Sequence, residues 1–390
     1  MDFDRIVDRR GTHSMKWDML ESQYGIPADD GIAMWVADMD FEPPAAVRNA
    51  VRSMLERGIF GYYGDDASYR TAIRGWMERR HGWLIEPDWI FTTHGLVNGT
   101  ALCVDVFTDP GDGVILFTPV YHAFSRVIRA AGRRIVECEL VEQDGRYHMD
   151  LDAWDDRMTG RETMAILCSP HNPGGCVWTV EELRDVAAFC ARHDLILVSD
   201  EIHQDLVFPG HVHVPTAVAA PEVSARLITL TATTKTFNIA GSHTGNVIIA
   251  DPNLARTFAA RLAALGLTPN SFGLFMAEAA YNEGEDWLEA LLVYLDENRR
   301  LFDTALNAVS GVRSMALEAT YLAWVDFTTT GLDSREVVER VENRARIATN
   351  HGATFGLGGD GFLRFNFACP RPRLEEALDR LQSAFADVSG

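Results

Sequence analysis

Short apolar segments alternate with helical patterns between about residues 48 and 250. Several of these segments, such as Val114–Phe117, are apolar throughout, as expected of strands covered on both faces. One intervening helix should begin at Thr179, because Glu182 three residues later completes a capping box. The alternation predicts an α/β fold with a mostly parallel sheet between layers of helices. The predicted strands are Trp89–Thr92, Val114–Phe117, Arg134–Cys138, Thr163–Cys168, Leu195–Ser199, Leu227–Thr231 and Asn246–Ala250.

The pattern changes after about residue 282, where long helical segments flank two further strands. A chain of 390 residues is long enough for two or three domains. We predict an N-terminal arm (residues 1–47), a large domain (48–281) and a smaller α+β domain (282–390) that the arm joins. Beyond the large sheet, helices are expected at Ala45–Glu56, Glu285–Leu306, Ser334–Arg346 and Pro372–Ala386, and strands at Leu322–Phe327 and Phe362–Phe367.

The composition restricts the class of protein. Hydrophobic residues make up 47% and charged residues 23%, which is ordinary for a soluble enzyme. No apolar run is long enough to span a bilayer, and the first residues show no signal-peptide pattern, so a cytoplasmic location is expected. The net charge of −21 argues against nonspecific nucleic-acid binding, which needs a cationic face. The six cysteines include no Cys-x-x-Cys pair, and we expect buried, reduced thiols instead of a disulfide framework or a zinc site.

Lysine is rare in this chain. Only Lys16 and Lys235 are lysines among 35 basic residues, and the rest are arginines. Lysine can lose its proton and form an imine, which arginine cannot, so a lysine kept against this bias is a candidate for chemistry. The surroundings of Lys235 support that interpretation, whereas for Lys16 we expect no special role.

The carboxyl ends of the predicted strands carry polar groups, and ligands of open α/β sheets bind outside such ends. Asp200, Lys235 and Asn172 each follow a different predicted strand. Gly95 and Leu96 follow another and open a helix, whose N-terminus presents free N–H groups that suit a phosphate. An amine, an acid, an amide and a phosphate cradle match the needs of pyridoxal 5'-phosphate (PLP): an amine for its aldehyde and a carboxylate for its pyridine nitrogen.

Eight motifs occur in order along nearly the whole chain. The sequence thereby resembles the fold-type I PLP-dependent enzymes of the aminotransferase superfamily and, among them, the cystathionine β-lyase and C–S lyase subgroup. The motifs that carry this resemblance are Met34–Phe41, Phe60–Tyr62, Thr118–Phe124, Cys168–Pro173, Ser199–His203, Lys235–Ile239, Thr320–Trp324 and Arg364–Asn366.

The resemblance implies roles around the cofactor ring. Lys235 would bind the cofactor aldehyde covalently and later move the Cα proton of the substrate, and Asp200 would pair with the pyridinium nitrogen. Asn172 would hydrogen-bond the ring hydroxyl with His203 near that edge, and Tyr121 would stack on the ring.

The resemblance also implies a phosphate site, a substrate site and a homodimer. The N–H groups of Gly95 and Leu96 would hold the phosphate, helped by Thr234 and by Tyr62 of the partner subunit. Arg364 would bind the substrate carboxylate through a two-pronged salt bridge, the geometry that arginine suits best. The implied catalytic set is Lys235, Tyr62 and Tyr121, and the implied substrate-binding set is Arg364, Asn172 and Tyr321, with no metal.

Each residue taken alone has a simpler explanation. Asp200 and His203 could cap a helix, Tyr121 could serve packing, and Arg364 could form a structural ion pair. The spacing of His211 and His213 is that of some metal ligands, but no third ligand is evident and we expect surface histidines.

Three features depart from the pattern of the relatives. Ala232 stands where many of them have a serine, and His243 stands where many aminotransferases have an arginine that pairs with the phosphate. A proline common before the C-terminal active-site loop is absent around residues 350–352. We therefore expect a less cationic phosphate site than in those relatives and a substrate pocket that can differ in shape.

The resemblance implies α,β-elimination from cystathionine or another S-substituted L-cysteine. Three alternatives stay open: an aminotransferase, an enzyme that acts on a bulky cysteine S-conjugate by elimination or by decarboxylation-linked deamination, and a regulatory contact with another protein. A PLP-fold sensor behind a DNA-binding extension is disfavoured, because the chain begins in the arm and is strongly acidic.

Overall fold

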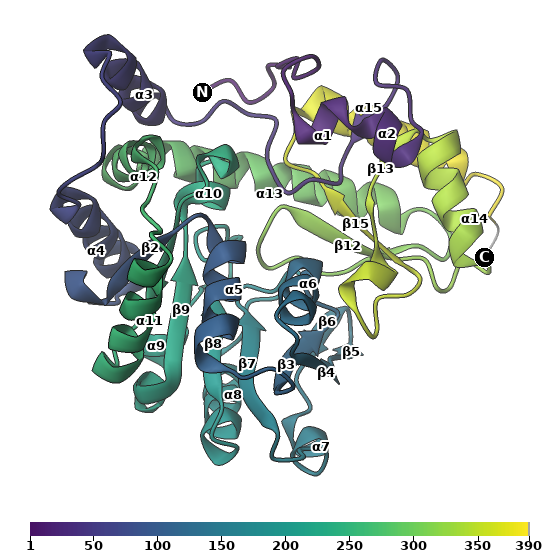
Figure 1. Cartoon of the computed structure of the whole chain (residues 1–390). Helices are drawn as coiled ribbons and strands as arrows, with labels where there is room; N and C mark the ends of the chain where they lie inside the picture. Colours follow the sequence, from purple (N-terminus) through teal and green to yellow (C-terminus); the bar gives the residue numbers. More distant parts are fainter. Residues whose placement is uncertain (389–390) are drawn as a thin grey trace.

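All seven strands predicted between residues 89 and 250 form one sheet, in the order β2-β10-β9-β8-β7-β3-β4 (Figure 1). The structure is a computed structural model that describes residues 1–388. β10 runs antiparallel to both of its neighbours, and every other adjacent pair is parallel, so the remaining strands all point the same way. The bounds are β2 Ile90–Thr93, β3 Gly113–Thr118, β4 Arg134–Glu139, β7 Glu162–Cys168, β8 Ile196–Asp200, β9 Leu227–Thr231 and β10 Gly245–Ile248.

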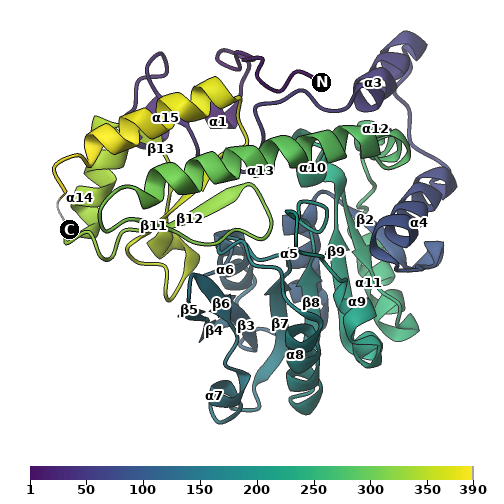
Figure 2. The same ribbon diagram turned by 180° about the vertical axis from the view of Figure 1, so that it is seen from behind.

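Helices cover both faces of this sheet, which explains its apolar strands. On β3, Val114 and Leu116 pack into one hydrophobic cluster, whereas Ile115 and Phe117 pack into another on the opposite face. Figure 1 shows α5 and α6 on the near side of the sheet. Figure 2, the view from behind, shows α8 on the opposite face. The helices of the first face are α5 Leu96–Phe107, α6 His122–Ala130 and α11 Pro252–Ala264, and those of the second are α8 Val180–Arg192 and α9 Thr216–Ala219.

A second, antiparallel sheet lies in the C-terminal part, in the order β11-β12-β15-β14. Figure 2 shows α13 extending from α12 on one side of the molecule to this sheet and α15 on the other. The predicted helix Ser334–Arg346 begins as an α-helix but continues as a π-helix. The bounds are β11 Arg313–Ser314, β12 Leu322–Asp326, β14 Asn350–His351, β15 Phe362–Asn366, α12 Ser271–Glu283, α13 Glu285–Asn307, α14 Ser334–Val338, η4 Glu339–Arg344 and α15 Arg371–Ala384.

The N-terminal arm lies against the C-terminal part of the chain. Its strand β1 (Ile32–Ala33) pairs in parallel with β13 (Ile347–Ala348). The predicted domain boundaries near residues 47 and 281 stay predictions, and residues 389 and 390 of the last domain lie outside the described residues. The other elements are α1 Met15–Asp18, α2 Leu20–Tyr24, α3 Ala45–Arg57, α4 Ala67–His81, η1 Pro87–Trp89, β5 Val141–Gln143, β6 Arg146–His148, α7 Leu151–Asp155, η2 Pro221–Arg226, α10 Thr233–Thr236, η3 Ala240–Ser242 and η5 Gly352–Phe355.

The structure tests two predictions made from the composition, one on the cysteines and one on membrane-spanning segments. All six cysteines are free and buried, which confirms the expected thiols. Within residues 1–388, no helix combines the length and the apolar character needed to cross a membrane.

The capping box predicted for α8 is present. Thr179 accepts a hydrogen bond from the Glu182 N–H at 3.1 Å, and the Glu182 carboxylate accepts one from the Thr179 N–H at 2.8 Å. We expect Thr179→Ala to lower the free energy of unfolding by about 1 kcal/mol, because an N–H of the first turn loses its partner. Urea denaturation measures this change. Thr257→Ala is the control, since Thr257 lies exposed inside α11 and should change stability little; equal losses in both variants would contradict the assignment.

Candidate active site

The parallel strands bring the predicted polar residues to one edge of the central sheet. β7, β8 and β9 are neighbours in the sheet. Asn172 follows β7, Asp200 is the last residue of β8, and Lys235 follows β9. The loops are held together across the edge: Ser169 N donates to Asp200 O at 2.9 Å, and Glu201 N donates to Leu230 O at 2.8 Å. The amide, the acid and the amine therefore lie side by side.

Asp200 is a buried carboxylate short of a cation. It is 5% exposed, and its Oδ1 accepts a hydrogen bond from Ile202 N at 3.2 Å. The pKa of Asp200 is raised from 3.8 to about 7, chiefly because burial disfavours the charged form. The charge of Glu201 adds to this shift, whereas the hydrogen bond from Ile202 and the charge of Lys235 oppose it. Residues 202–205 form turns and not a helix, so the helix-cap explanation does not apply. The site would stabilise a cationic ligand group placed against this carboxylate.

Lys235 lies on the short helix α10, and its Nζ donates to Ala37 O at 2.6 Å. Desolvation lowers the pKa of Lys235 to about 8, Asp38 and Asp200 raise it, and Arg364 lowers it. An amine with this pKa is partly unprotonated near neutral pH, which suits a nucleophile or a base.

Arg364 on β15 is a buried cation whose hydrogen bonds all go to neutral groups. Its Nη1 donates to Asn172 Oδ1 at 2.9 Å, and its Nη2 donates to Asn350 Oδ1 at 2.5 Å and to Trp35 O at 3.2 Å. Its Nε has no partner, and burial lowers its pKa to about 10. No aspartate or glutamate among residues 1–388 forms an ion pair with Arg364, so the structural ion-pair explanation is wrong. A desolvated guanidinium without a counter-ion is a site for an anion.

Three ring side chains surround these charges. Tyr321 donates its hydroxyl to Ala37 O at 3.0 Å, beside the lysine. His203 is 2% exposed and its Nδ1 has no hydrogen-bond partner, so it does not cap a helix. Burial, with the charges of Lys235 and Arg364, lowers the pKa of His203 to about 3, and its ring is neutral. Tyr121 N donates to Asn172 O at 3.1 Å, which ties the predicted stacking tyrosine to the same edge.

Gly95 and Leu96 form the start of α5 at this edge. Gly95 has φ 82° and ψ 167°, a conformation almost restricted to glycine. Sequence reasoning missed a second glycine, Gly245, where an added Cβ would lie 2.5 Å from Leu96 Cδ2 and 3.0 Å from Gly95 C. Nothing in the strand pattern signals this close approach. Thr234 is buried on α10 near the lysine.

Within one chain, Tyr62 does not lie with the other predicted site residues. Its side chain is fully exposed, at 103%, in the stretch between α3 and α4. His243 is exposed as well, with φ 46° at the end of η3, and Ala232 is the buried N-cap of α10.

Two expectations from the sequence are wrong. His213 is not a surface residue: it is 6% exposed, and its Nε2 lies 3.1 Å from Glu201 Oε2. Lys16 has a definite structural role, because its side chain is fully buried with Nζ 2.9 Å from Asp40 Oδ2. In the part of the chain that the structure describes, no cluster of three or more His, Cys, Asp or Glu side chains could hold a metal ion.

Comparisons with known proteins identify the family. A family model described as aminotransferase class I and II matches residues 30–381. The chain belongs to the aminotransferase class I and II family. Cystathionine beta-lyase PatB of Bacillus subtilis (strain 168) is 37% identical over 389 residues, which cover 99% of this chain and 100% of that protein.

Solved structures of family members show the same fold. Cystalysin from Treponema denticola, whose structure contains a PLP cofactor, has a TM-score of 0.95 and 35% identity over 100% of this chain and 99% of that chain. A PLP-bound putative aminotransferase from Clostridium difficile 630 has a TM-score of 0.95 and 36% identity over 98% of this chain and 99% of that chain. The predicted fold, a fold-type I sheet flanked by helices, is confirmed.

Burial raises the pKa of Asp200 to about 7 in the folded, ligand-free protein, compared with 3.8 when the group is in water. Between these two pH values the folded protein keeps the proton of Asp200, whereas the unfolded chain has lost it. The carboxyl group therefore destabilises this ligand-free protein increasingly as the pH rises from about 4 to about 7. We expect Asp200→Asn to melt at a higher temperature than wild type at pH 8, with a smaller gap at pH 4. Thermal denaturation against pH measures the gap; the control is Asp105→Asn at an exposed carboxylate, and a gap independent of pH would contradict the assignment.

Proposed function

We propose that this protein is a PLP-dependent carbon–sulfur β-lyase acting on cystathionine or another S-substituted L-cysteine. The products are a thiol, pyruvate and ammonia, with one water consumed. The observation that carries the proposal is the buried guanidinium of Arg364, held by Asn172 and Asn350 without a carboxylate partner and close enough to lower the pKa of Lys235. A carboxylate site next to a reactive amine is what an α-amino acid substrate requires, and the full-length similarity to a cystathionine β-lyase indicates the reaction.

The residues present fit PLP. The cofactor, when bound, draws electrons from the substrate Cα and so makes its proton acidic. Asp200 would hold the ring nitrogen, since its buried carboxyl accepts a hydrogen bond from Ile202 N and forms no ion pair within residues 1–388. Lys235 would carry the aldehyde, the start of α5 at Gly95 would hold the phosphate, and Tyr121 would cover the ring. Neutral His203, with an unpartnered Nδ1, is available to a hydrogen-bonding group near the Asn172 side.

The chain's own residues bind the substrate and move its proton. Arg364 binds the carboxylate, which fixes the orientation of the Cα–H bond. The Lys235 amine, with a pKa near 8, accepts the Cα proton, and the bond from Cβ to sulfur then breaks as the thiolate leaves. Ala37 O and the Tyr321 hydroxyl lie beside this amine and would hold it in place between steps.

We also propose a homodimer in the cytoplasm. Tyr62 projects fully into solvent together with the exposed Ile59 and Phe60, so in one chain this tyrosine serves no site. A second subunit would cover these side chains and use Tyr62 at its own phosphate site. Free, buried cysteines suit a reducing compartment.

The reaction is tested with a panel of S-substituted cysteines that includes cystathionine. We expect thiol, pyruvate and ammonia in equal amounts, because elimination breaks the Cβ–S bond once per turnover. Alanine supplied with a keto acid is the control for amino transfer. A new amino acid in place of pyruvate would indicate an aminotransferase, and release of carbon dioxide would indicate decarboxylation; either result as the main reaction would contradict the proposal.

The role of Lys235 has a test with few possible outcomes, because the chain contains two lysines, Lys16 and Lys235. After borohydride reduction of the holoenzyme, peptide mass mapping should place the cofactor on Lys235. Lys235→Ala should lose the imine absorbance and nearly all turnover, since a positioned base contributes about 10²–10⁴-fold. An active Lys235→Ala enzyme, or cofactor attached to Lys16, would overturn the assignment.

A further inference from the structure

The segment of residues 35–40 forms one wall of the site without being a helix or a strand. Its carbonyl oxygens accept hydrogen bonds from side chains. Those of Trp35 and Ala37 face the site, where they accept hydrogen bonds from Arg364 at 3.2 Å and from Lys235 at 2.6 Å. Asn366 holds the carbonyls of residues 36 and 38 at 2.6 Å each, and Asn238 holds that of residue 39 at 2.9 Å. The position of this wall therefore depends on side chains from distant parts of the chain.

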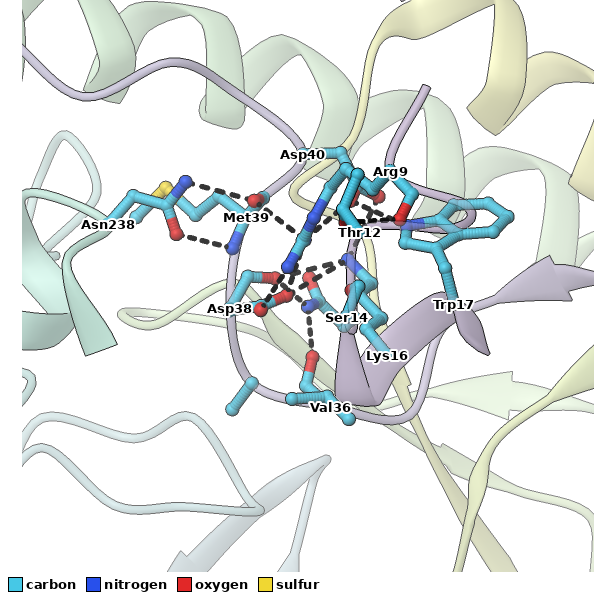
Figure 3. Close-up of polar contacts among 12 residues, drawn as sticks. Arg9, Thr12, Ser14, Lys16, Trp17, Val36, Asp38, Met39, Asp40 and Asn238 are labelled. Carbon is cyan, nitrogen blue, oxygen red and sulfur yellow. Dashed lines mark hydrogen bonds and ion pairs between the residues drawn. The ribbon is translucent and has the colours of Figure 1, made fainter. Parts of the chain in front are cut away.

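Two acidic residues of this segment, Asp38 and Asp40, are held by side chains of the N-terminal arm (Figure 3). Asp40 is 3% exposed and accepts hydrogen bonds from Lys16 Nζ at 2.9 Å, from Arg9 Nη1 at 2.8 Å and from Trp17 Nε1 at 2.9 Å. Arg9 also grips Asp38 with both terminal nitrogens, at 2.9 and 2.6 Å. We call these five residues the arm cluster.

Lys16 is the member whose charge is most deeply enclosed. Its side chain is fully buried, and its Nζ donates to Asp40 Oδ2 and, at 3.1 Å, to Asp38 O. One ammonium thus joins a carboxylate and a backbone carbonyl of the same segment. The ammonium is a compact group with three donors, which suits two acceptors at a fully buried position. Removing the ammonium would leave a buried carboxylate with fewer partners, and the segment would shift.

We propose that Lys16 is a positioning residue of the active site. Through Asp38 and Asp40 it holds residues 35–40 so that the carbonyls of Trp35 and Ala37 orient Arg364 and Lys235. The inference rests on the proposed lyase function for the identity of the bound ligands.

The consequence is measurable as carboxylate affinity. Arg364 binds a carboxylate well only when its guanidinium plane is fixed, and the Trp35 carbonyl is one of its three hydrogen-bond partners. A shift of about 1 Å in a positioned group can cost up to about 10²-fold in rate. Loss of the Lys16 charge should therefore weaken substrate binding, seen as a higher KM, even in protein that stays folded and keeps its cofactor.

The experiment compares Lys16→Met with wild type and with Arg10→Met as holoenzymes. Arg10 is the control because it also lies in the arm and forms an ion pair, with Asp8 at 2.9 Å, but does not contact residues 35–40. The probe is 3-(methylthio)propanoate, which has the carboxylate and the sulfur of a substrate but no amino group to react. Calorimetry gives its dissociation constant, and the KM and kcat for an S-substituted cysteine are measured in parallel.

We expect Lys16→Met to bind the probe about tenfold more weakly and to raise KM more than it lowers kcat. Arg10→Met should stay within about twofold of wild type. If Lys16→Met does not fold, Arg9→Met decides, because Arg9 is the cluster's other cation and its side chain is 24% exposed. Wild-type affinity in the folded variant, even with a lower melting temperature, would overturn the inference. Failure of wild type to bind PLP or cleave any substrate would instead contradict the proposed function.

Discussion

The site depends on burying charges that the chain itself does not neutralise. Arg364 has amide and carbonyl partners but no acid, and Asp200 has a backbone N–H but no bonded cation. Such groups cost free energy in the folded chain, and ligands that supply the missing charges recover it. The shifted pKa values of Asp200, Lys235 and Arg364 have the same origin, since desolvation is the largest cause in each. Burial of these charges therefore both favours the binding of ligands with the opposite charge and shifts the pKa values of the site.

Three distant parts of the chain hold these charges. The central sheet supplies Asp200 and Lys235 at neighbouring strand ends. The C-terminal sheet supplies Arg364 on β15 and Asn350 on β14, while the arm supplies the carbonyls of residues 35–40. Because Arg364 hydrogen-bonds to a group from each of these parts, the orientation of its guanidinium depends on their relative positions. The arm cluster extends that coupling to Arg9, Lys16 and Trp17 of the arm.

Sequence reasoning worked where a pattern repeats along the chain. The central strands were predictable because residues on both of their faces are buried, as Val114 and Ile115 show on β3. Sequence reasoning failed for residues whose surroundings are formed by segments distant in the chain. His213 lies in a loop without regular periodicity, and only the fold encloses it beside Glu201. The π-helix after Val338 has no signature in the apolar pattern, and Gly245 is critical only because α5 begins against it.

The sequence by itself determined the α/β fold and the order of polar residues at the strand ends. These follow from local periodicity and from the rule that ligands lie at carboxyl ends of parallel strands. Tertiary structure alone decided which charges lack partners, since an ion pair is a relation between distant residues. Lys16 and Lys235 look alike as sparse lysines in an arginine-rich chain. Lys16 pairs with the buried carboxylate of Asp40, whereas Lys235 donates to the Ala37 carbonyl in a site where burial lowers its pKa to about 8.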